Sequence, residues 1–153
     1  MTDIFGISPE NQTVSRITLS GHGMTANILT WGATLQELRL DGYEHPLVIG
    51  FTTLQDYLDH SQYHGVTAGR VINRIGGSRA IIDNVEYRLS SNQHGGHMLH
   101  GGRTGYGERD WRVVDQSATH VTLALTDPHA RMGFPGTGEA QCRYSLVDGP
   151  RRE

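Results

Sequence analysis

The stretch His64–Trp111, HGVTAGRVINRIGGSRAIIDNVEYRLSSNQHGGHMLHGGRTGYGERDW, holds most of the unusual chemistry of the chain. It contains an Asn-Arg pair and three evenly spaced histidines flanked by glycine pairs: Asn73-Arg74, His94, His97, His100, Gly95-Gly96 and Gly101-Gly102. Glycine lets the backbone approach a ligand closely because it has no Cβ. Arginine and asparagine offer directed donors to oxygen-rich groups, and histidine can act as an acid or a base near neutral pH. The stretch therefore predicts a polar pocket for a small hydroxylated ligand.

Several short motifs follow one another in a fixed order along the same stretch. They are AGRVINRI at 68–75, Y-x-L-x-x-N at 87–92, LHGG at 99–102, and Tyr106-Gly107 followed by Trp111. Further matching runs are WGATLQ at 31–36, LVIGF at 47–51 and GFPG at 133–136. Each motif is weak alone, but the order and spacing are specific. The chain resembles the aldose 1-epimerase (galactose mutarotase) family over about residues 14–147.

This resemblance implies an all-β fold, part of a galactose-mutarotase-like β-supersandwich that is mostly antiparallel with one short helix. Family members are about twice as long, so residues 1–153 are expected to form a single incomplete domain, the N-terminal half of such a sandwich. A truncated gene, a frameshift or a deliberate truncation would each give such a chain. A half-sandwich leaves an apolar face and an open sheet edge, which predicts self-association.

The pattern of residues supports the same class. Strands are expected where β-branched and apolar residues alternate between turn residues, at 14–20, 24–30, 34–40, 46–50, 79–83, 85–89, 111–115, 121–126 and 139–147. Polar residues 1–13 are expected to form a loose entry segment. Few helical patterns compete with these strands, so the class is all-β.

Two local features are predicted in more detail. Thr52–His60 is the expected short helix, capped by Thr52 or Thr53, with the side chains of Leu54, Tyr57 and Leu58 on one side. Asp83-Asn84 is the expected turn of a hairpin. The strand after that turn should direct Val85, Tyr87 and Leu89 toward the core.

Composition excludes several classes of protein. All 13 basic residues are arginine, so a Schiff-base lysine and a P-loop lysine are excluded. Cys142 is the only cysteine, which excludes an intrachain disulfide and a thiolate zinc cage. The net charge of −3 argues against broad nucleic-acid binding. The chain has no long apolar run and no signal-peptide pattern at its start, so no membrane partner and a cytoplasmic location are expected.

The resemblance also implies roles for individual residues. His100 matches the LHGG histidine, which assists catalysis in the family by hydrogen-bonding sugar hydroxyl oxygens and holding the ring. Asn73 and Arg74 match the Asn-Arg pair that binds sugar hydroxyls. The alternatives are a histidine in a tight glycine turn and an arginine in a salt bridge at a strand end. Arg70 is expected to be structural, and His64 to lie near the pocket.

The three histidines also raise the question of a metal. His94, His97 and His100 could hold zinc with water as the fourth ligand. Their spacing suits neither one face of a strand nor a helix interrupted by glycines. The run holds no Asp or Glu to orient the imidazoles. No metal site and no cofactor are therefore expected.

In the family, the reaction interconverts the α and β anomers of free aldoses such as glucose or galactose. A base removes the proton of the C1 hydroxyl while an acid protonates the ring oxygen. These groups are a glutamate and a second histidine of the C-terminal half, and neither has a matching position here. The chain alone is therefore expected to be a weak or inactive enzyme. The alternatives are a sugar-binding or interaction module and a non-functional remnant, and phosphorylated hexoses remain a substrate option.

Overall fold

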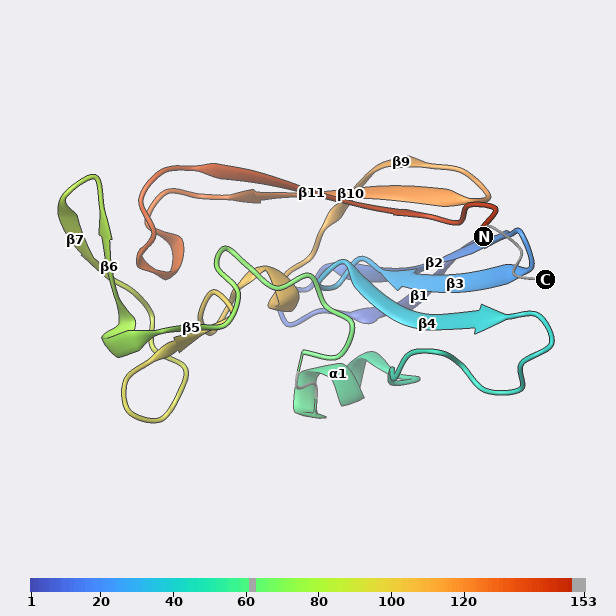
Figure 1. Cartoon of the computed structure of the whole chain (residues 1–153), viewed down its shortest axis with the longest axis horizontal. Coiled ribbons are helices and arrows are strands. Elements are labelled where there is room, and N and C mark those ends of the chain that lie inside the picture. Colours follow the sequence, from blue (N-terminus) through green and yellow to red (C-terminus); the bar gives the residue numbers. More distant parts are fainter. Residues whose placement is uncertain (61–62, 150–153) are drawn as a thin grey trace.

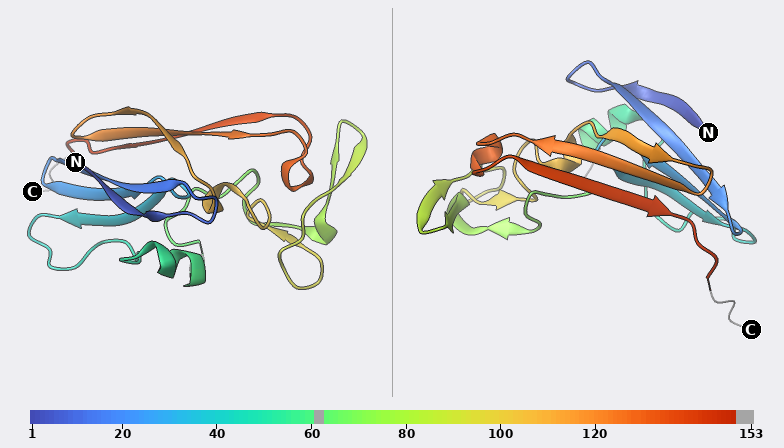
Figure 2. Two further views of the ribbon diagram at one scale, coloured as in Figure 1. Left: turned by 180° about the vertical axis from the view of Figure 1, so that it is seen from behind. Right: turned by 90° about the horizontal axis from the view of Figure 1, so that it is seen from above.

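Two antiparallel sheets lie face to face in the computed structural model, which describes residues 1–60 and 63–149 (Figures 1 and 2). The first sheet has the order β1-β2-β3-β4, with β1 at Thr2–Ile7, β2 at Thr13–Gly21, β3 at Met24–Leu29 and β4 at Thr34–Leu40. The second has the order β11-β10-β9, with β9 at Arg112–Gln116, β10 at His120–Asp127 and β11 at Gly138–Ser145. The predicted all-β, mostly antiparallel class is confirmed.

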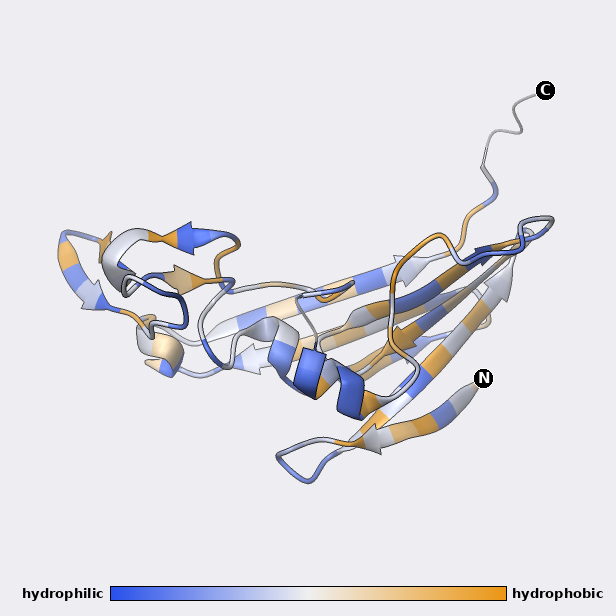
Figure 3. Ribbon diagram, turned by 90° about the horizontal axis from the view of Figure 1, so that it is seen from below, coloured by the Kyte–Doolittle hydropathy of each residue, from blue (hydrophilic) through white to orange (hydrophobic). Residues whose placement is uncertain are grey.

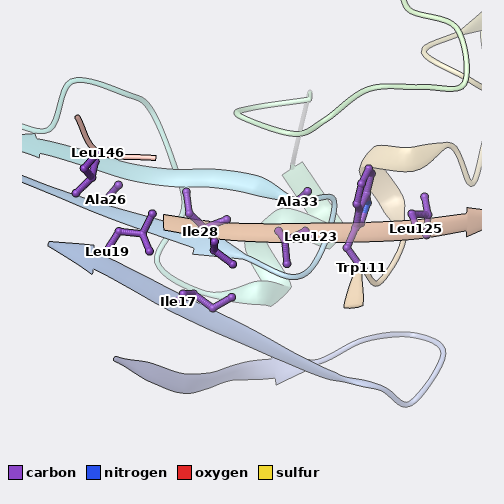
Figure 4. Packing of buried hydrophobic residues seen from close by; sticks show 10 residues of the cluster. Ile17, Leu19, Ala26, Ile28, Ala33, Trp111, Leu123, Leu125 and Leu146 are labelled. Atoms are coloured by element: carbon purple, nitrogen blue, oxygen red, sulfur yellow. The ribbon is translucent and has the colours of Figure 1, made fainter. Parts of the chain in front are cut away.

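The main core lies between the two sheets. Hydrophobic and hydrophilic residues alternate along many of the strands (Figure 3), and β2, β3 and β10 present their apolar sides to the opposite sheet. Ile17 of β2 and Ile28 of β3 are at most 2% exposed, and they face Leu123 of β10, which is fully buried (Figure 4). The predicted inward face of β10, with Val121 and Leu125, is confirmed. Burying a large aliphatic side chain contributes about 1.5–3 kcal/mol to folding.

The only α-helix in the described part of the chain is α1, Leu54–His60. The Thr53 hydroxyl accepts a hydrogen bond from the Asp56 backbone N–H at 3.2 Å, which confirms the predicted cap. Leu54 and Tyr57 are buried, as predicted. Leu58 is 36% exposed, at the edge of the same side of the helix, because residues four apart lie on one face. Tyr57 and Leu58 line one cavity together, so the predicted common side is confirmed, although only Leu54 and Tyr57 are buried.

A smaller, loop-rich region projects from one end of the sandwich (Figure 1). It holds two short ladders, β5 (Arg74–Ile75) with β8 (Met98–Leu99), and β6 (Arg79–Ile82) with β7 (Val85–Arg88). Three 3₁₀ turns lie at Gly76–Ser78, Tyr106–Glu108 and Arg131–Gly133.

The β6–β7 hairpin turns where the sequence predicts. Asp83 and Asn84 both have positive φ angles, 51° and 62°, as a tight hairpin turn requires. Leu89 is buried, as predicted. Val85 is 51% exposed, so its predicted core position is wrong, because the hairpin tip extends beyond both sheets.

Two other predictions are wrong. Residues 1–13 are not loose, because β1 pairs along its length with β2, from Thr2 opposite Ile17 to Ile7 opposite Thr13. Ile4 and Ile7 of this edge strand are 72% and 55% exposed, so β1 has no regular apolar face that the sequence could reveal. Residues 46–50 form no strand, and Ile49 is 75% exposed. A single backbone bond, from Leu47 to Leu38 at 2.7 Å, ties this run to β4.

The outer edges of the second sheet are open within the described residues. β11 pairs with β10 alone, and β9 also pairs with β10 alone. No helix in residues 1–60 and 63–149 is long and apolar enough to cross a membrane.

Candidate functional site

The three site residues expected from the sequence meet at the β5–β8 ladder. Arg74 stands opposite Leu99 in this ladder, so Asn73 and His100 are neighbours across it. The His100 backbone N–H donates to the Asn73 carbonyl, and the Asn73 backbone N–H donates to Nδ1 of His100, both at 3.1 Å. Both residues have positive φ angles, 62° and 51°, which only a small share of non-glycine residues adopt. Residues 27 positions apart thus fix each other's conformation.

The imidazole of His100 is oriented on two sides. Because Nδ1 accepts a hydrogen bond from the Asn73 backbone, the neutral ring carries its proton on Nε2. The Tyr63 ring packs against it, with centroids 4.5 Å apart and planes inclined by 58°. No hydrogen bond joins Nε2 to another described residue, so this N–H can donate to a ligand oxygen.

Asn73 and Arg74 place polar groups beside this imidazole. Oδ1 of Asn73 accepts from the Arg74 backbone N–H at 2.9 Å and lies 3.5 Å from the Arg74 guanidinium. The guanidinium also donates to Oε1 of Gln93 at 3.3 Å. Arg74 is exposed and has no carboxylate partner among the described residues. Its charge is therefore available to a ligand, unlike that of an arginine in a structural salt bridge.

The glycine after His100 explains how the loop packs so closely. Gly101 has a φ of 88°, and a Cβ there would lie 1.7 Å from the carbonyl oxygen of Gly69. Only glycine fits such an approach. The LHGG loop and the segment before Asn73-Arg74 are therefore packed backbone to backbone.

A buried ion cluster anchors that segment to the sandwich. Asp127, at the end of β10, accepts from Arg70 at 2.7 Å and from Arg109 at 2.8 Å. Arg70 also donates to the carbonyls of Pro135 and Gly136 at 2.8 and 3.1 Å. Burial lowers the pKa of Arg109, and the nearby Arg131 charge lowers it further. Arg70 is thus bound within the protein, as expected for a structural residue.

Tyr63 also lines a cavity of about 310 Å³. Trp31 and Tyr57 also line this cavity, together with the carboxyl-bearing Glu108. Burial raises the pKa of the Glu108 carboxyl. Burial also raises the pKa of Tyr63, and the Glu108 charge adds to that effect.

The remaining histidines do not join the site. Nδ1 of His97 accepts from the Gly77 backbone N–H at 2.9 Å, and His94 is exposed. His64 packs against Phe51 on the side of α1, with ring centroids 5.5 Å apart. In the part of the chain that the structure describes, no group of three or more His, Cys, Asp or Glu side chains could hold a metal ion.

Comparison with known proteins identifies the family. Residues 15–151 match the family model for aldose 1-epimerase. The chain belongs to the aldose 1-epimerase family. The aldose 1-epimerase of Escherichia coli K12 is 34% identical over 149 residues, which cover 95% of this chain and 43% of that protein. The galactose mutarotase of Sus scrofa is 31% identical, again over 95% of this chain and 43% of the relative. The chain therefore spans less than half the length of these relatives.

Solved structures of the family have the same fold. The GalM/aldose epimerase homologue from C. elegans matches with a TM-score of 0.81 and 33% identity, over 87% of this chain and 42% of that one. A galactose 1-epimerase from Lactobacillus acidophilus matches with a TM-score of 0.80 and 27% identity, over 97% and 45%. The two sheets are therefore those of a galactose-mutarotase-like fold.

Two further residues lie at the site, and the sequence motifs do not assign a role to either. Tyr63 contacts the His100 ring, and Asn92 hydrogen-bonds to Leu99, the residue before His100. Asn92 ends the Y-x-L-x-x-N motif, so its place in that motif was the available indication. No sequence motif marks Tyr63, because its contact with His100 joins residues 37 positions apart.

Proposed function

We propose that this chain forms part of the sugar-contacting wall of an aldose 1-epimerase. Its ligand is a free aldose such as glucose or galactose, bound without a cofactor. The observation that carries the proposal is the meeting of Asn73, Arg74 and His100 at one ladder, with an imidazole N–H and a guanidinium free to bind. Arginine and histidine donors suit the closely spaced hydroxyl oxygens of a sugar.

The proposed roles follow from these donors. Nε2–H of His100 donates to a hydroxyl oxygen and assists by holding the ring. The guanidinium of Arg74 donates to one or two neighbouring oxygens, and the Asn73 amide completes the contact. These groups bind and orient the sugar, while ring opening needs an acid and a base on opposite sides of it.

We further propose that the isolated chain is catalytically weak or inactive. In the family, the base is a glutamate and the acid a second histidine, both beyond the region matched here. The second candidate function is therefore a sugar-binding module without catalysis, which the free donors of the site favour equally.

Polarimetry tests the proposed inactivity of the chain. Freshly dissolved α-D-glucose and α-D-galactose are followed with the purified chain and with buffer alone, because mutarotation is also spontaneous. We expect the two traces to overlay. A clear acceleration that His100→Ala abolishes would contradict the proposed inactivity.

Sugar binding is measured separately, by calorimetric titration with galactose and glucose. Saturable binding is expected, and Arg74→Ala should weaken it about tenfold, as for loss of charged hydrogen bonds. Arg79→Ala is the matched control, because Arg79 is also exposed but pairs with Glu86 on the projecting hairpin. No saturable binding by the unmodified chain would refute the proposed sugar contact.

A further inference from the structure

Asn92 holds the residue before His100 as a third strand would. Its Oδ1 accepts from the Leu99 backbone N–H at 2.7 Å, and its Nδ2 donates to the Leu99 carbonyl at 3.0 Å. Leu99 stands opposite Arg74 in the ladder, yet its two backbone polar groups bind Asn92. In an antiparallel pair, alternate residues point these groups away from the partner strand. One side chain thus satisfies the open side of β8.

The same amide reaches the aromatic neighbour of His100. Nδ2 of Asn92 lies 3.4 Å from the Tyr63 hydroxyl, and the Tyr63 ring packs against the imidazole. The backbone before His100 and the ring beside it are therefore both in contact with one residue.

We propose that Asn92 and Tyr63 are positioning residues that hold His100 with its Nε2–H directed at the sugar. This inference rests on the proposed function. Asn92 fixes the backbone, Tyr63 limits rotation of the imidazole, and the Asn73 N–H fixes its tautomer. A donor held in place before binding loses less freedom when the ligand arrives, and this raises affinity.

The first test measures galactose affinity in three variants. Asn92→Ala and Tyr63→Leu should each weaken binding about fivefold or more, comparable to the loss of one hydrogen bond. Tyr63→Phe should stay within about twofold, because it keeps the ring and loses only a long hydroxyl contact. If Tyr63→Phe retains galactose affinity and Tyr63→Leu loses it, the aromatic ring of Tyr63 positions His100 and the hydroxyl does not.

Asn27→Ala is the matched control. Asn27 accepts from the Thr18 hydroxyl at 2.8 Å and donates to Glu37 at 3.0 Å, within the first sheet and away from the site. Its loss should lower stability and leave galactose affinity unchanged. Equal loss of affinity in Asn27→Ala and Asn92→Ala would overturn the proposal, because it would mean that general destabilisation causes the effect.

The second test needs no sugar. The NMR signals of the His100 ring should carry a ring-current shift that Tyr63→Phe keeps, Tyr63→Leu abolishes and Asn92→Ala reduces. Nδ1 should give the nitrogen signal of an unprotonated imidazole nitrogen. If the unmodified chain binds no galactose, the proposed function fails. The NMR signals then still show whether Asn92 and Tyr63 hold the His100 ring in place. His100 signals unchanged in both Asn92→Ala and Tyr63→Leu would overturn the inference.

Discussion

At the scale of single residues, backbone conformation limits which side chains the site accepts. Gly101→Ala should lower the free energy of unfolding by about 3 kcal/mol or more, because its Cβ would meet the Gly69 carbonyl. Gly96 is the matched control, since it also has a positive φ, 73°, but open space around its Cα. Gly96→Ala should cost only about 1–2 kcal/mol. Urea unfolding of both variants checks this, and equal losses would contradict the close approach.

A carboxyl group outside the site should make stability depend on pH. Oδ2 of Asp110 accepts from the Ser8 hydroxyl at 2.7 Å, while its buried Oδ1 has no partner in the described residues. Burial raises the pKa of Asp110 above its ordinary 3.8, the Ser8 bond opposes this, and the Glu10 charge adds to it. The folded chain therefore binds this proton more tightly than the unfolded chain does. Stability falls as pH rises from the unfolded pKa through the folded one, and the cost stays constant above it.

Asp110→Asn should remove that cost. An asparagine carbonyl can still accept from Ser8, and it carries no charge to desolvate. We expect the variant to be more stable than the unmodified chain at pH 7 and equally stable below about pH 3.8, where Asp110 is protonated in both states. Thermal melts across this range test the prediction. A difference independent of pH would point to packing, not charge.

At the scale of elements, the ion cluster around Asp127 joins the site segment to β10. The side chains of Asp127, Arg109 and Arg70 are only 6%, 11% and 21% exposed. Asp127→Asn leaves two largely buried guanidinium groups without their carboxylate, which should cost about 3 kcal/mol. Asp3→Asn breaks the exposed pair with Arg16 and should cost about 1 kcal/mol or less. Chemical denaturation of both variants compares them, and similar losses would argue against the anchoring role.

The sequence predicts best those elements that a pattern of a few neighbouring residues specifies. The alternation from Val121 to Leu125 and the Asp83-Asn84 turn each lie within a few residues, and both are confirmed. The sequence does not reveal β1, because TDIFGI shows no alternation of polar and apolar residues and the strand is an edge strand held by its pairing with β2. The run 46–50 looked like a buried strand by composition, but few partners hold it to β4.

The residues of the candidate site also divide into those that local motifs specify and those that depend on contacts between distant segments. Motif order was enough to select Asn73, Arg74 and His100, which lie together in the fold. The contact of Tyr63 with His100 depends on how distant loops pack. Local patterns hold no information about such a contact, so it could not be predicted from them.

At the scale of the whole molecule, the open edge of β11 should lead to self-association. The Leu146 N–H donates to Thr119, so alternation along the strand directs the N–H of Gln141 away from β10. Exposed strand edges of this kind pair with other chains. We expect the apparent mass from light scattering to rise with concentration. Gln141→Pro should reduce that rise, because proline lacks the outward N–H and edge strands tolerate it.

Gln141→Ser is the control for this prediction. Serine removes the same side chain but keeps the backbone N–H, so association should persist. A mass that stays at that of one chain over the whole concentration range would contradict the role of the open edge.

The absence of lysine has a practical consequence for measuring ligand binding. In a purified chain of residues 1–153, which contain no lysine, the α-amino group of Met1 is the single primary amine, and it donates to the Thr18 carbonyl at 3.1 Å. It lies at the end of the sandwich away from the β5–β8 ladder (Figure 1). Amine coupling to a sensor surface would therefore attach every molecule at one point. All the immobilised molecules would present the Arg74–His100 side to the solution in a common orientation.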